Sequence, residues 1–495
     1  MSTLDEPVKQ AAVLKNYIDG HWVESRGALR DVVNPATQKV IARAPSSTPD
    51  EVNAAAASAC RAFSGWRRTP PVSRARYLLR LIELLEENFE ELSRIQTMEH
   101  GKTIDESRGE TRRGIENIEV AAGIPSLMMG YNLQDISVGI DSQVIREPLG
   151  VFACIPPFNF PFMVPLWFIP YAVATGNTIV TKPSPDVPIS QTRLHELIDE
   201  AGFPPGVVNM VHGGQEAGNQ LLEHPDIKGI TFVGSTRVGR LIYQKCGETG
   251  KRAIVQGGAK NFLVVLPDAD IVNTISSMLT SFYGNAGQRC LSGANAIIVG
   301  KDDDFYRKLV NDFAEAADAI SVGYGLEDGI QMGPLQSKDK KKRVEAYIEQ
   351  GIREGARLKL DGRNLHIRGD LPDACFLNPT IFEGVTPEMT IGKEEIFGPV
   401  ANFMRAATLD EAIDMIHSIP YGNAATIYTS NGKWAREFEY RVHAGNIGVN
   451  IGIVAPMAFF PFSGTKGSFF GILHGQGQEA VRFFTESKVV VKRWW

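Results

Sequence analysis

The sequence predicts an α/β protein, and three observations support this prediction. The chain has 495 residues, which is long enough for two or three domains with substantial cores. From residue 150 onward, short apolar segments alternate with helix-like segments, which is typical of βαβ units and a parallel sheet. The composition, with 43% hydrophobic and 22% charged residues, 48 glycines and 28 prolines, is that of a globular protein rich in tight turns.

Before residue 150 the sequence predicts a hairpin and two helices. The dipeptide Asp-Gly at 19–20 lies between apolar residues, a pattern typical of a β-hairpin. A helix is expected to begin at Thr48, because Thr48 and Glu51 have the spacing of a capping box and Pro49 falls in the first turn. A second, longer helix is expected over 73–100. Its apolar residues share one face: Leu78, Leu81, Ile82, Leu85, Phe89 and Leu92.

The segment 151–174 is almost wholly apolar and long enough to resemble a membrane span. Each proline in it would remove a helix hydrogen bond and clash with the preceding turn. These prolines are Pro156, Pro157, Pro161, Pro165 and Pro170. We therefore expect a buried strand, a rigid loop and a core-facing helix.

Two series of strands are expected after residue 150. The first comprises GVFACI, NTIVTK, GVVNMV, GITFV and RAIVQ. In such parallel sheets ligand sites lie at the carboxyl ends of the strands. The second begins near Asp268, passes through ANAIIVG, NPTIF and GNIGVN, and indicates a second α/β domain over 257–455. The tail SKVVVKRWW is strand-like and could pair outside its own subunit.

Charge and cysteine usage limit the partners. Lys and Arg number 51 against 57 Asp and Glu, a net charge of −6, so no global basic field would attract nucleic acid or an anionic membrane. The basic run 338–343 is expected to be a solvated helix start. The five cysteines are widely spaced without CxxC or CxxH pairs, which argues for a reducing compartment and against a zinc site. Because no secretory signal is seen at the start, we expect a cytoplasmic protein. The cysteine spacing gives no reason to expect a bound metal.

Two short segments have both a structural and a chemical interpretation. Cys290 lies among small residues directly after Arg289. It is either a buried small hydrophobe or a nucleophile whose thiolate Arg289 and a local helix start would stabilise. No GxGxxG occurs, but Gly234, Ser235 and Gly239 follow the strand GITFV. That turn is either an ordinary helix cap or a site whose amides and hydroxyls face a pyrophosphate.

Five segments together resemble, in order and spacing, the motif series of the aldehyde dehydrogenase superfamily. They are PFNFP at 157–161, GNTIVTKP at 176–183, FVGST at 232–236, GQRC at 287–290 and EEIFGPV at 394–400. Three further stretches resemble the methylmalonate-semialdehyde dehydrogenases, which oxidise a 3-oxo acid and transfer the acyl group to coenzyme A. These are RRGIENIEVAAGIP at 112–125, AGQRCLS at 286–292 and MAFFPFSGTKGSFFG at 457–471.

The resemblance implies an aldehyde dehydrogenase-like fold with three parts. A Rossmann-like dinucleotide-binding domain would comprise 1–130 and 150–256, and an α/β catalytic domain 257–455. Strands in 131–149 and 475–495 would form a small β element for oligomerisation. The expected assembly is a homotetramer, with a dimer as the alternative.

The resemblance also assigns roles to individual residues. Cys290 matches the nucleophile and Asn159 the amide that donates to the oxyanion. The residues that match the cofactor site are Phe158, Lys182, Gly234, Ser235, Gly239, Glu395 and Phe397. Arg113 and Arg289 are candidates to bind a substrate carboxylate, since guanidinium bonds carboxylate bidentately. A purely structural Asn159, a surface Glu395 and an ion-paired Arg113 on a helix surface are the alternatives.

Three positions depart from the family pattern, namely Pro185, Gln256 and Thr465, where Thr465 replaces a bulkier aromatic residue. Pro185 stands three residues after Lys182, where many relatives have a glutamate that bonds the ribose hydroxyls. We therefore expect NAD as cofactor, with NADP possible. Gln256 stands where hydrolytic relatives have their general base. The expected reaction is oxidation of malonate or methylmalonate semialdehyde through a Cys290 thioester, with decarboxylation and acyl transfer to coenzyme A. The alternatives are a hydrolytic NAD(P)-dependent aldehyde dehydrogenase acting on another aldehyde, and a catalytically silent scaffold.

Overall fold

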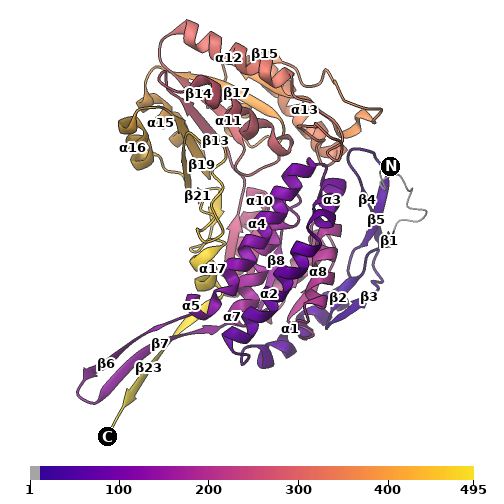
Figure 1. Cartoon of the computed structure of the whole chain (residues 1–495), viewed down its shortest axis with the longest axis vertical. Helices are drawn as coiled ribbons and strands as arrows, with labels where there is room; N and C mark the ends of the chain where they lie inside the picture. The colour runs from indigo at the N-terminus through magenta and orange to yellow at the C-terminus, as the bar shows by residue number, and fades with distance from the viewer. Residues whose placement is uncertain (1–11) are drawn as a thin grey trace.

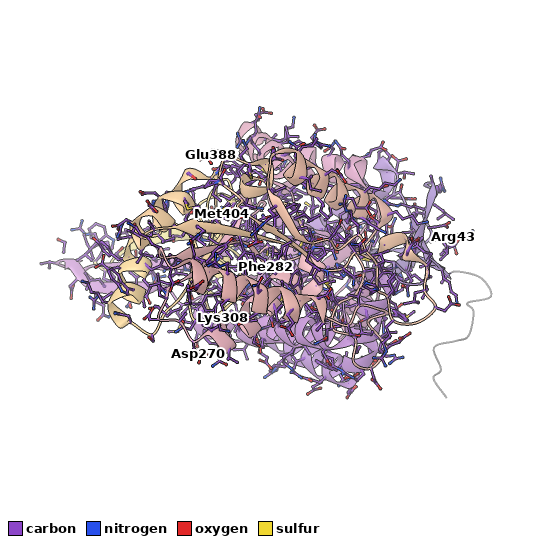
Figure 2. All side chains as sticks on the ribbon, turned by 90° about the horizontal axis from the view of Figure 1, so that it is seen from above. Arg43, Asp270, Phe282, Lys308, Glu388 and Met404 are labelled. Atoms are coloured by element: carbon purple, nitrogen blue, oxygen red, sulfur yellow. The ribbon has the colours of Figure 1, made fainter. Side chains whose placement is uncertain are left out.

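The computed structural model describes residues 12–495. Two large sheets, each with helices packed against it, form the body of the protein, and a small three-stranded sheet projects from it (Figure 1). Charged residues such as Arg43, Asp270, Lys308 and Glu388 are exposed, whereas Phe282 and Met404 are buried (Figure 2). The α/β class predicted from the sequence is confirmed.

The first large sheet contains the five predicted parallel strands. They run in the order β12 (Arg252–Gln256), β11 (Ile227–Val233), β8 (Val151–Ile155), β9 (Thr178–Thr181) and β10 (Val208–Met210). β22 (Phe469–Phe470) adds at one edge, and β2 (Asn16–Ile18) and β3 (His21–Val23) at the other. The predicted hairpin is confirmed between β2 and β3, where Asp19 and Gly20 have φ of 56° and 76°. Strands β8, β9 and β11 end close together, because β8 lies between the other two.

Helices around the first sheet follow the predicted periodicity with one correction. α1 (Pro49–Trp66) begins with the predicted capping box of Thr48 and Glu51. The single helix expected over 73–100 is wrong: the chain forms α2 (Pro71–Glu87) and α3 (Phe89–His100). Asn88 separates them with φ −105° and ψ 16°, and its side chain donates to the Leu84 carbonyl at 2.7 Å. Asparagine favours such local hydrogen bonds over helix continuation.

The other helices of this part are α4 (Ile104–Ala122), α5 (Ile124–Leu127), α8 (Ile189–Glu200), α9 (Gln215–Glu223) and α10 (Thr236–Thr249). The apolar segment 151–174 forms the predicted buried strand β8 and loop, but two short helices, α6 (Met163–Leu166) and α7 (Ile169–Thr175), stand where a single helix was predicted. Within residues 12–495, no helix has both the length and the apolar character needed to cross a bilayer.

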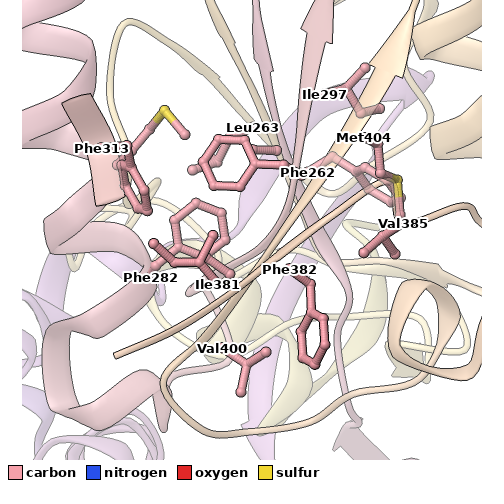
Figure 3. Packing of buried hydrophobic residues seen from close by; sticks show 14 of the residues in the cluster. Phe262, Leu263, Phe282, Ile297, Phe313, Ile381, Phe382, Val385, Val400 and Met404 are labelled. Carbon is pink, nitrogen blue, oxygen red and sulfur yellow. The ribbon is translucent and has the colours of Figure 1, made fainter. Parts of the chain in front are cut away.

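The second large sheet has the order β15 (Arg357–Leu360), β16 (Thr380–Glu383), β17 (Val400–Ala406), β14 (Gly293–Val299), β13 (Asn261–Val265), β19 (Ala424–Tyr428) and β20 (Asn446–Val449). All neighbours are parallel except β15 and β16. Its helices are α11 (Ile271–Tyr283), α12 (Asp303–Asp318), α13 (Lys338–Arg353), α14 (Thr390–Lys393), α15 (Leu409–Ser418) and α16 (Gly432–Arg441). Phe262, Phe282, Phe313 and Phe382 are buried in its core (Figure 3).

The projecting sheet consists of β6 (Tyr131–Ser137), β7 (Ile140–Pro148) and β23 (Thr485–Arg493) (Figure 1). The predicted strand in the tail is present as β23, which pairs antiparallel with β7 of the same chain along its whole length. Residues 475–484 were expected to be strand, which is wrong: α17 (Gly477–Phe483) occupies most of this range. Ala480, Val481 and Phe483 of α17 are buried, so this segment belongs to the body of the molecule.

The remaining strands are short or peripheral. β1 (Ala12–Val13), β4 (Leu29–Val33) and β5 (Val40–Pro45) form a sheet of their own, and β18 (Tyr421–Gly422) pairs with β21 (Thr465–Lys466). Two 3₁₀ turns, η1 (Gly284–Gly287) and η2 (Asp373–Cys375), complete the structure. Of these elements, η1 bears most directly on the site because it leads into Cys290.

Candidate active site

Cys290 lies in a turn between η1 and β14. Its carbonyl accepts hydrogen bonds from the side-chain amides of Asn261 at 2.8 Å and Asn423 at 2.7 Å. In the preceding η1, Asn285 and Ala286 have φ of 55° and 50°, in the left-handed region that non-glycine residues rarely adopt. Such a conformation persists only where the surroundings impose it, and it is common at functional sites.

Cys290 lines a cavity of about 440 Å³ together with Arg113 and Arg289. The structure thus brings together the predicted nucleophile and both predicted substrate residues. Much of the remaining wall is apolar and comes from Phe160, Met163, Trp167, Leu291, Ile453 and Phe462. A small aldehyde with one carboxylate would find both an apolar wall and fixed cations here.

Both arginines are paired with carboxylates. Arg289 Nη2 lies 2.9 Å from Glu106 Oε1, and Arg113 Nη1 lies 3.0 Å from Glu116 Oε2. Arg113 therefore forms the ion pair that the alternative interpretation expected. It also lines the cavity, so the ion pair leaves its candidacy as a substrate residue intact. Sequence reasoning missed Glu106. The sequence signal for Glu106 is the capping box that it forms with Thr103 at the start of α4. The Glu106 carboxylate also reaches Arg289.

The thiol of Cys290 has a raised pKa in this structure. Burial raises it to about 12, the nearby Glu395 contributes in the same direction, and Arg289 opposes them. Arg289 lowers this pKa as expected, but the net shift expected from the sequence is wrong because burial and Glu395 outweigh Arg289. Cys290 also lies in a turn rather than at a helix start. The thiol is therefore protonated at neutral pH before ligands bind.

This raised pKa predicts how alkylation of Cys290 depends on pH. Without cofactor, the rate with iodoacetamide should rise about tenfold per pH unit up to pH 9 without a plateau, because only the thiolate reacts. Glu395→Gln should speed the reaction above about pH 7, where Glu395 is ionised, since it removes a charge that disfavours the thiolate. Mass spectrometry of the Cys290 peptide measures the rate. A plateau below pH 9 in the parent protein would contradict the raised pKa.

Asn159 lies in the loop between β8 and α6, close to the backbone before Cys290. Its buried side-chain Nδ2 donates to the Gln288 carbonyl at 2.9 Å. One amide hydrogen is used there, which leaves the second N–H for another acceptor. Its backbone carbonyl accepts from Lys102 Nζ at 2.7 Å.

The residues predicted to bind the adenosine half of a cofactor directly follow β9 and β11, whose carboxyl ends lie close together. Buried Lys182 comes directly after β9 and donates to the carbonyls of Pro183 at 3.0 Å and Gly213 at 2.9 Å. Burial lowers the pKa of Lys182 to about 8. After β11, Gly234 leads to Ser235, whose hydroxyl caps α10 by accepting from the Val238 amide at 3.5 Å.

Gly239 serves the packing of α10 against the sheet. A Cβ at this position would lie 2.7 Å from a methyl of Val255 in β12. Glycine therefore allows the helix to approach the strand closely. Only Gly234 and Ser235 separate β11 from α10, so the N-terminus of α10 lies near the ends of the strands, where it favours negative charge.

The predicted nicotinamide-side residues come from both large sheets. Glu395 accepts from the Ala259 amide at 2.9 Å, and burial raises its pKa to about 7. The ring of Phe397, at φ 59°, packs edge-on against Phe158 with 5.8 Å between centroids. Phe158 follows β8, whereas Glu395 and Phe397 precede β17. The groups predicted from distant motifs thus meet across the two α/β units.

Two residues around Phe158 were not predicted. His100 is fully buried and stacks on the Phe158 ring at 6.0 Å, and Lys340 Nζ lies 4.1 Å from the ring centroid. Lys340 belongs to the basic run 338–343, which starts α13 as predicted. Lys338, Lys342 and Arg343 are exposed as predicted, whereas Lys340 is largely covered and its Nζ lies 2.9 Å from Asp186.

Gln256 ends β12, and its side chain is buried. Nε2 donates to the Phe462 carbonyl at 3.1 Å, while Oε1 has no hydrogen-bond partner among the described residues. Gln256 and Cys290 line a second, very small cavity together. A neutral amide therefore faces the space beside the thiol where a general base would have to act.

Comparison with known proteins decides the family. The model of the aldehyde dehydrogenase family matches residues 22–490. The chain belongs to the aldehyde dehydrogenase family. It is therefore an oxidoreductase, and the resemblance seen in the five motifs is confirmed.

Individual relatives of this aldehyde dehydrogenase are similar over nearly their whole length. Malonate-semialdehyde dehydrogenase 2 of Geobacillus kaustophilus is 47% identical over 482 residues, covering 97% of this chain and 99% of the relative. Malonate-semialdehyde dehydrogenase of Halalkalibacterium halodurans is 46% identical, with coverage of 97% and 98%.

Two solved structures share the fold closely. The crystal structure of a methylmalonate-semialdehyde dehydrogenase from Oceanimonas doudoroffii has a TM-score of 0.95 and 39% identity, covering 98% of both chains. The NAD⁺ complex of an aldehyde dehydrogenase from Bacillus cereus has a TM-score of 0.91 and 33% identity, covering 97% of this chain and 96% of that one. The predicted aldehyde dehydrogenase-like fold is confirmed.

Proposed function

We propose that this protein catalyses the NAD-dependent oxidation of malonate or methylmalonate semialdehyde and transfers the resulting acyl group to coenzyme A. The observation that carries the proposal is the cavity that holds Cys290, Arg113 and Arg289 together. A thiol beside two guanidinium groups suits an aldehyde that carries a carboxylate. The names of the relatives at 46–47% identity support this substrate class.

The residues at the strand ends fit a dinucleotide. The N-terminus of α10, capped by Ser235, and the buried ammonium of Lys182 provide amides and positive charge for ribose and pyrophosphate. Glu395 and Phe397 would hold the nicotinamide half. When bound, NAD supplies a hydride acceptor whose positive charge also favours the Cys290 thiolate. Because Pro185 lacks a carboxylate that would repel a 2′-phosphate, NADP is tolerated as well.

Oxidation proceeds on Cys290. The Cys290 thiol first loses its proton to solvent, and the thiolate sulfur then adds to the aldehyde carbon while the free N–H of the Asn159 amide donates to the developing oxyanion. Loss of hydride from the same carbon leaves a thioester on Cys290. Arg113 and Arg289 orient the carboxylate of the substrate. The β-carboxylate of the thioester then leaves as carbon dioxide, the resulting enolate takes up a proton from water, and the acyl group remains on sulfur.

Release of the acyl group requires a nucleophile that needs no strong base. Gln256 cannot accept a proton from water, and its Nε2 is already committed to the Phe462 carbonyl. A fraction of the coenzyme A thiol is ionised near neutral pH, and thiolates are good nucleophiles. Acyl transfer to coenzyme A therefore outpaces hydrolysis.

The assembly we propose is a homotetramer formed through the projecting sheet. Its apolar side chains are exposed in the single chain, among them Tyr131, Leu133, Val138, Val489 and Val491. Exposed apolar surface of this extent marks an interface in soluble proteins. Analytical ultracentrifugation should give a tetramer, and a monomer at micromolar concentration would contradict this assembly.

Substitution of the cavity arginines tests the substrate class. Arg113→Leu and Arg289→Leu should each raise KM for malonate semialdehyde by about 10- to 100-fold, because a charge-assisted bond to its carboxylate is lost. KM for propanal, which has no carboxylate, should change little. Steady-state NADH formation with both aldehydes measures the difference.

Arg112→Leu is the matched control. Arg112 is adjacent in sequence but exposed, where it pairs with Glu86 at 2.9 Å outside the cavity. It should behave like the parent enzyme with both aldehydes. Parallel losses on malonate semialdehyde and propanal in the cavity variants would mean that the arginines support the fold or the thiol, not the carboxylate.

A further inference from the structure

A buried ion pair lies beneath the loop that carries Asn159. The side chains of Lys102 and Glu110 are both fully inaccessible to solvent, and Nζ lies 2.5 Å from Oε2. Lys102 stands in the short connection between α3 and α4, and Glu110 in the second turn of α4. Removing two charges from water is costly, and a well-packed apolar pair is often at least as stabilising. Stability alone does not explain why charges occupy these positions.

Both charged groups hold the loop between β8 and α6. Lys102 Nζ donates to the Asn159 carbonyl at 2.7 Å and lies 4.2 Å from the centre of the Phe160 ring. Glu110 Oε1 accepts from the backbone amides of Phe162 at 2.9 Å and Met163 at 3.1 Å. The pair therefore fixes the backbone at Asn159 and again three and four residues later.

The backbone of Asn159 determines where its side-chain amide points. That amide lies 2.9 Å from the Gln288 carbonyl, two residues before Cys290. Oxyanion donors are effective only when they are held at hydrogen-bond distance from the developing charge. A displacement of about 1 Å in such a site can reduce the rate roughly 100-fold.

We infer that Lys102 and Glu110 are positioning residues that hold the Asn159 amide toward the oxygen of the aldehyde bound to Cys290. This inference rests on the proposed role of Asn159 as oxyanion donor. Glu110 also lines the cavity. Lys102 and the amides of Phe162 and Met163 occupy its carboxylate oxygens, however, so the pair acts through the loop. Its contribution should therefore disappear when the Asn159 amide is absent.

The test is a double-mutant comparison that uses the full-length protein. Lys102→Met with Glu110→Gln removes both charges, keeps an acceptor for the amides of Phe162 and Met163, and preserves volume. With propanal as the aldehyde, the rate of the first NADH turnover should fall by about 10- to 100-fold. NAD affinity, measured by fluorescence titration, should stay within about threefold of the parent. In the Asn159→Ala background the same changes should cause no further loss.

Glu383→Gln is the control for neutralising a buried carboxylate. Glu383 is buried in the other large sheet, where it pairs with Arg357, and it does not line the cavity. Its first-turnover rate should equal that of the parent. Glu110→Gln alone gives the same comparison if the double variant melts below the assay temperature, because it changes no volume.

The outcomes separate the two proposals. Equal losses in the parent and Asn159→Ala backgrounds would show a general structural role and overturn the positioning inference. An unchanged rate in Lys102→Met/Glu110→Gln, together with a large loss in Asn159→Ala, would overturn the positioning inference alone. A small loss in Asn159→Ala itself would refute the donor role and the inference with it.

Discussion

Cys290→Ala is expected to abolish dehydrogenase turnover while NAD binding remains nearly intact. The thiol forms the covalent bond to the aldehyde carbon, and no other described side chain in the cavity is a comparable nucleophile. Its side chain is small, and the hydrogen bonds at this position go to its backbone carbonyl, so the turn should keep its shape. NADH formation and NAD titration by fluorescence measure the two properties.

Cys60→Ala is the matched control, because Cys60 is an exposed cysteine on α1. It should retain the activity of the parent. Turnover of Cys290→Ala within tenfold of the parent would remove Cys290 from the mechanism. Loss of NAD binding in Cys290→Ala would instead show that the substitution disturbs the fold of the site.

Asn159→Ala is expected to lower kcat by about 10²–10³-fold with little change in KM. Removing one oxyanion donor costs about 2.7–4 kcal/mol of transition-state stabilisation. The substitution would also leave the Gln288 carbonyl, which accepts from the Asn159 amide, without this donor. Some loss of folding stability is therefore expected beside the loss of rate. Stopped-flow measurement of the first NADH turnover separates the chemical step from later acyl release. A loss smaller than tenfold would make Asn159 a structural residue.

Local patterns in the sequence predicted most of the first sheet because each buried strand is short, apolar and bounded by turn residues. The capping box at Thr48 and the Asp-Gly hairpin were equally local signals. The break at Asn88 was missed because the apolar periodicity continues across it, and only the side-chain bond to Leu84 reveals it. Likewise, α17 lies where tertiary packing against α7 outweighs the strand-like character of the adjacent tail.

Motifs in the sequence predicted the residues of the candidate site, but they did not predict the charged residues that hold those residues in place. Glu106 pairs with Arg289 across 183 positions, and Lys102 reaches the carbonyl of Asn159 across 57. No local pattern reports such contacts, because each of these residues is also an ordinary component of a helix start or a helix face. The direction of the net Cys290 pKa shift was wrong for the same reason: the burial of the thiol and the position of Glu395 depend on the fold.

Dependence on coenzyme A distinguishes acyl transfer from hydrolysis most directly. The decisive residue is Gln256, the neutral amide that shares a small cavity with Cys290. A general base typically contributes about 10²–10⁴-fold, so its absence should leave the thioester long-lived in water. Gln256→Glu should accordingly raise the rate of acyl release without coenzyme A if its carboxylate reaches a water beside the thioester.

The most direct measurement is NADH formation from malonate semialdehyde and NAD, recorded before and after addition of coenzyme A. The proposed function predicts a burst of about one NADH per active site without coenzyme A, since the acyl group stays on Cys290. Adding coenzyme A should then start sustained turnover with acetyl-CoA as product. Rapid steady turnover of the parent enzyme to free acid, unaffected by coenzyme A, would contradict acyl transfer and show a hydrolytic aldehyde dehydrogenase.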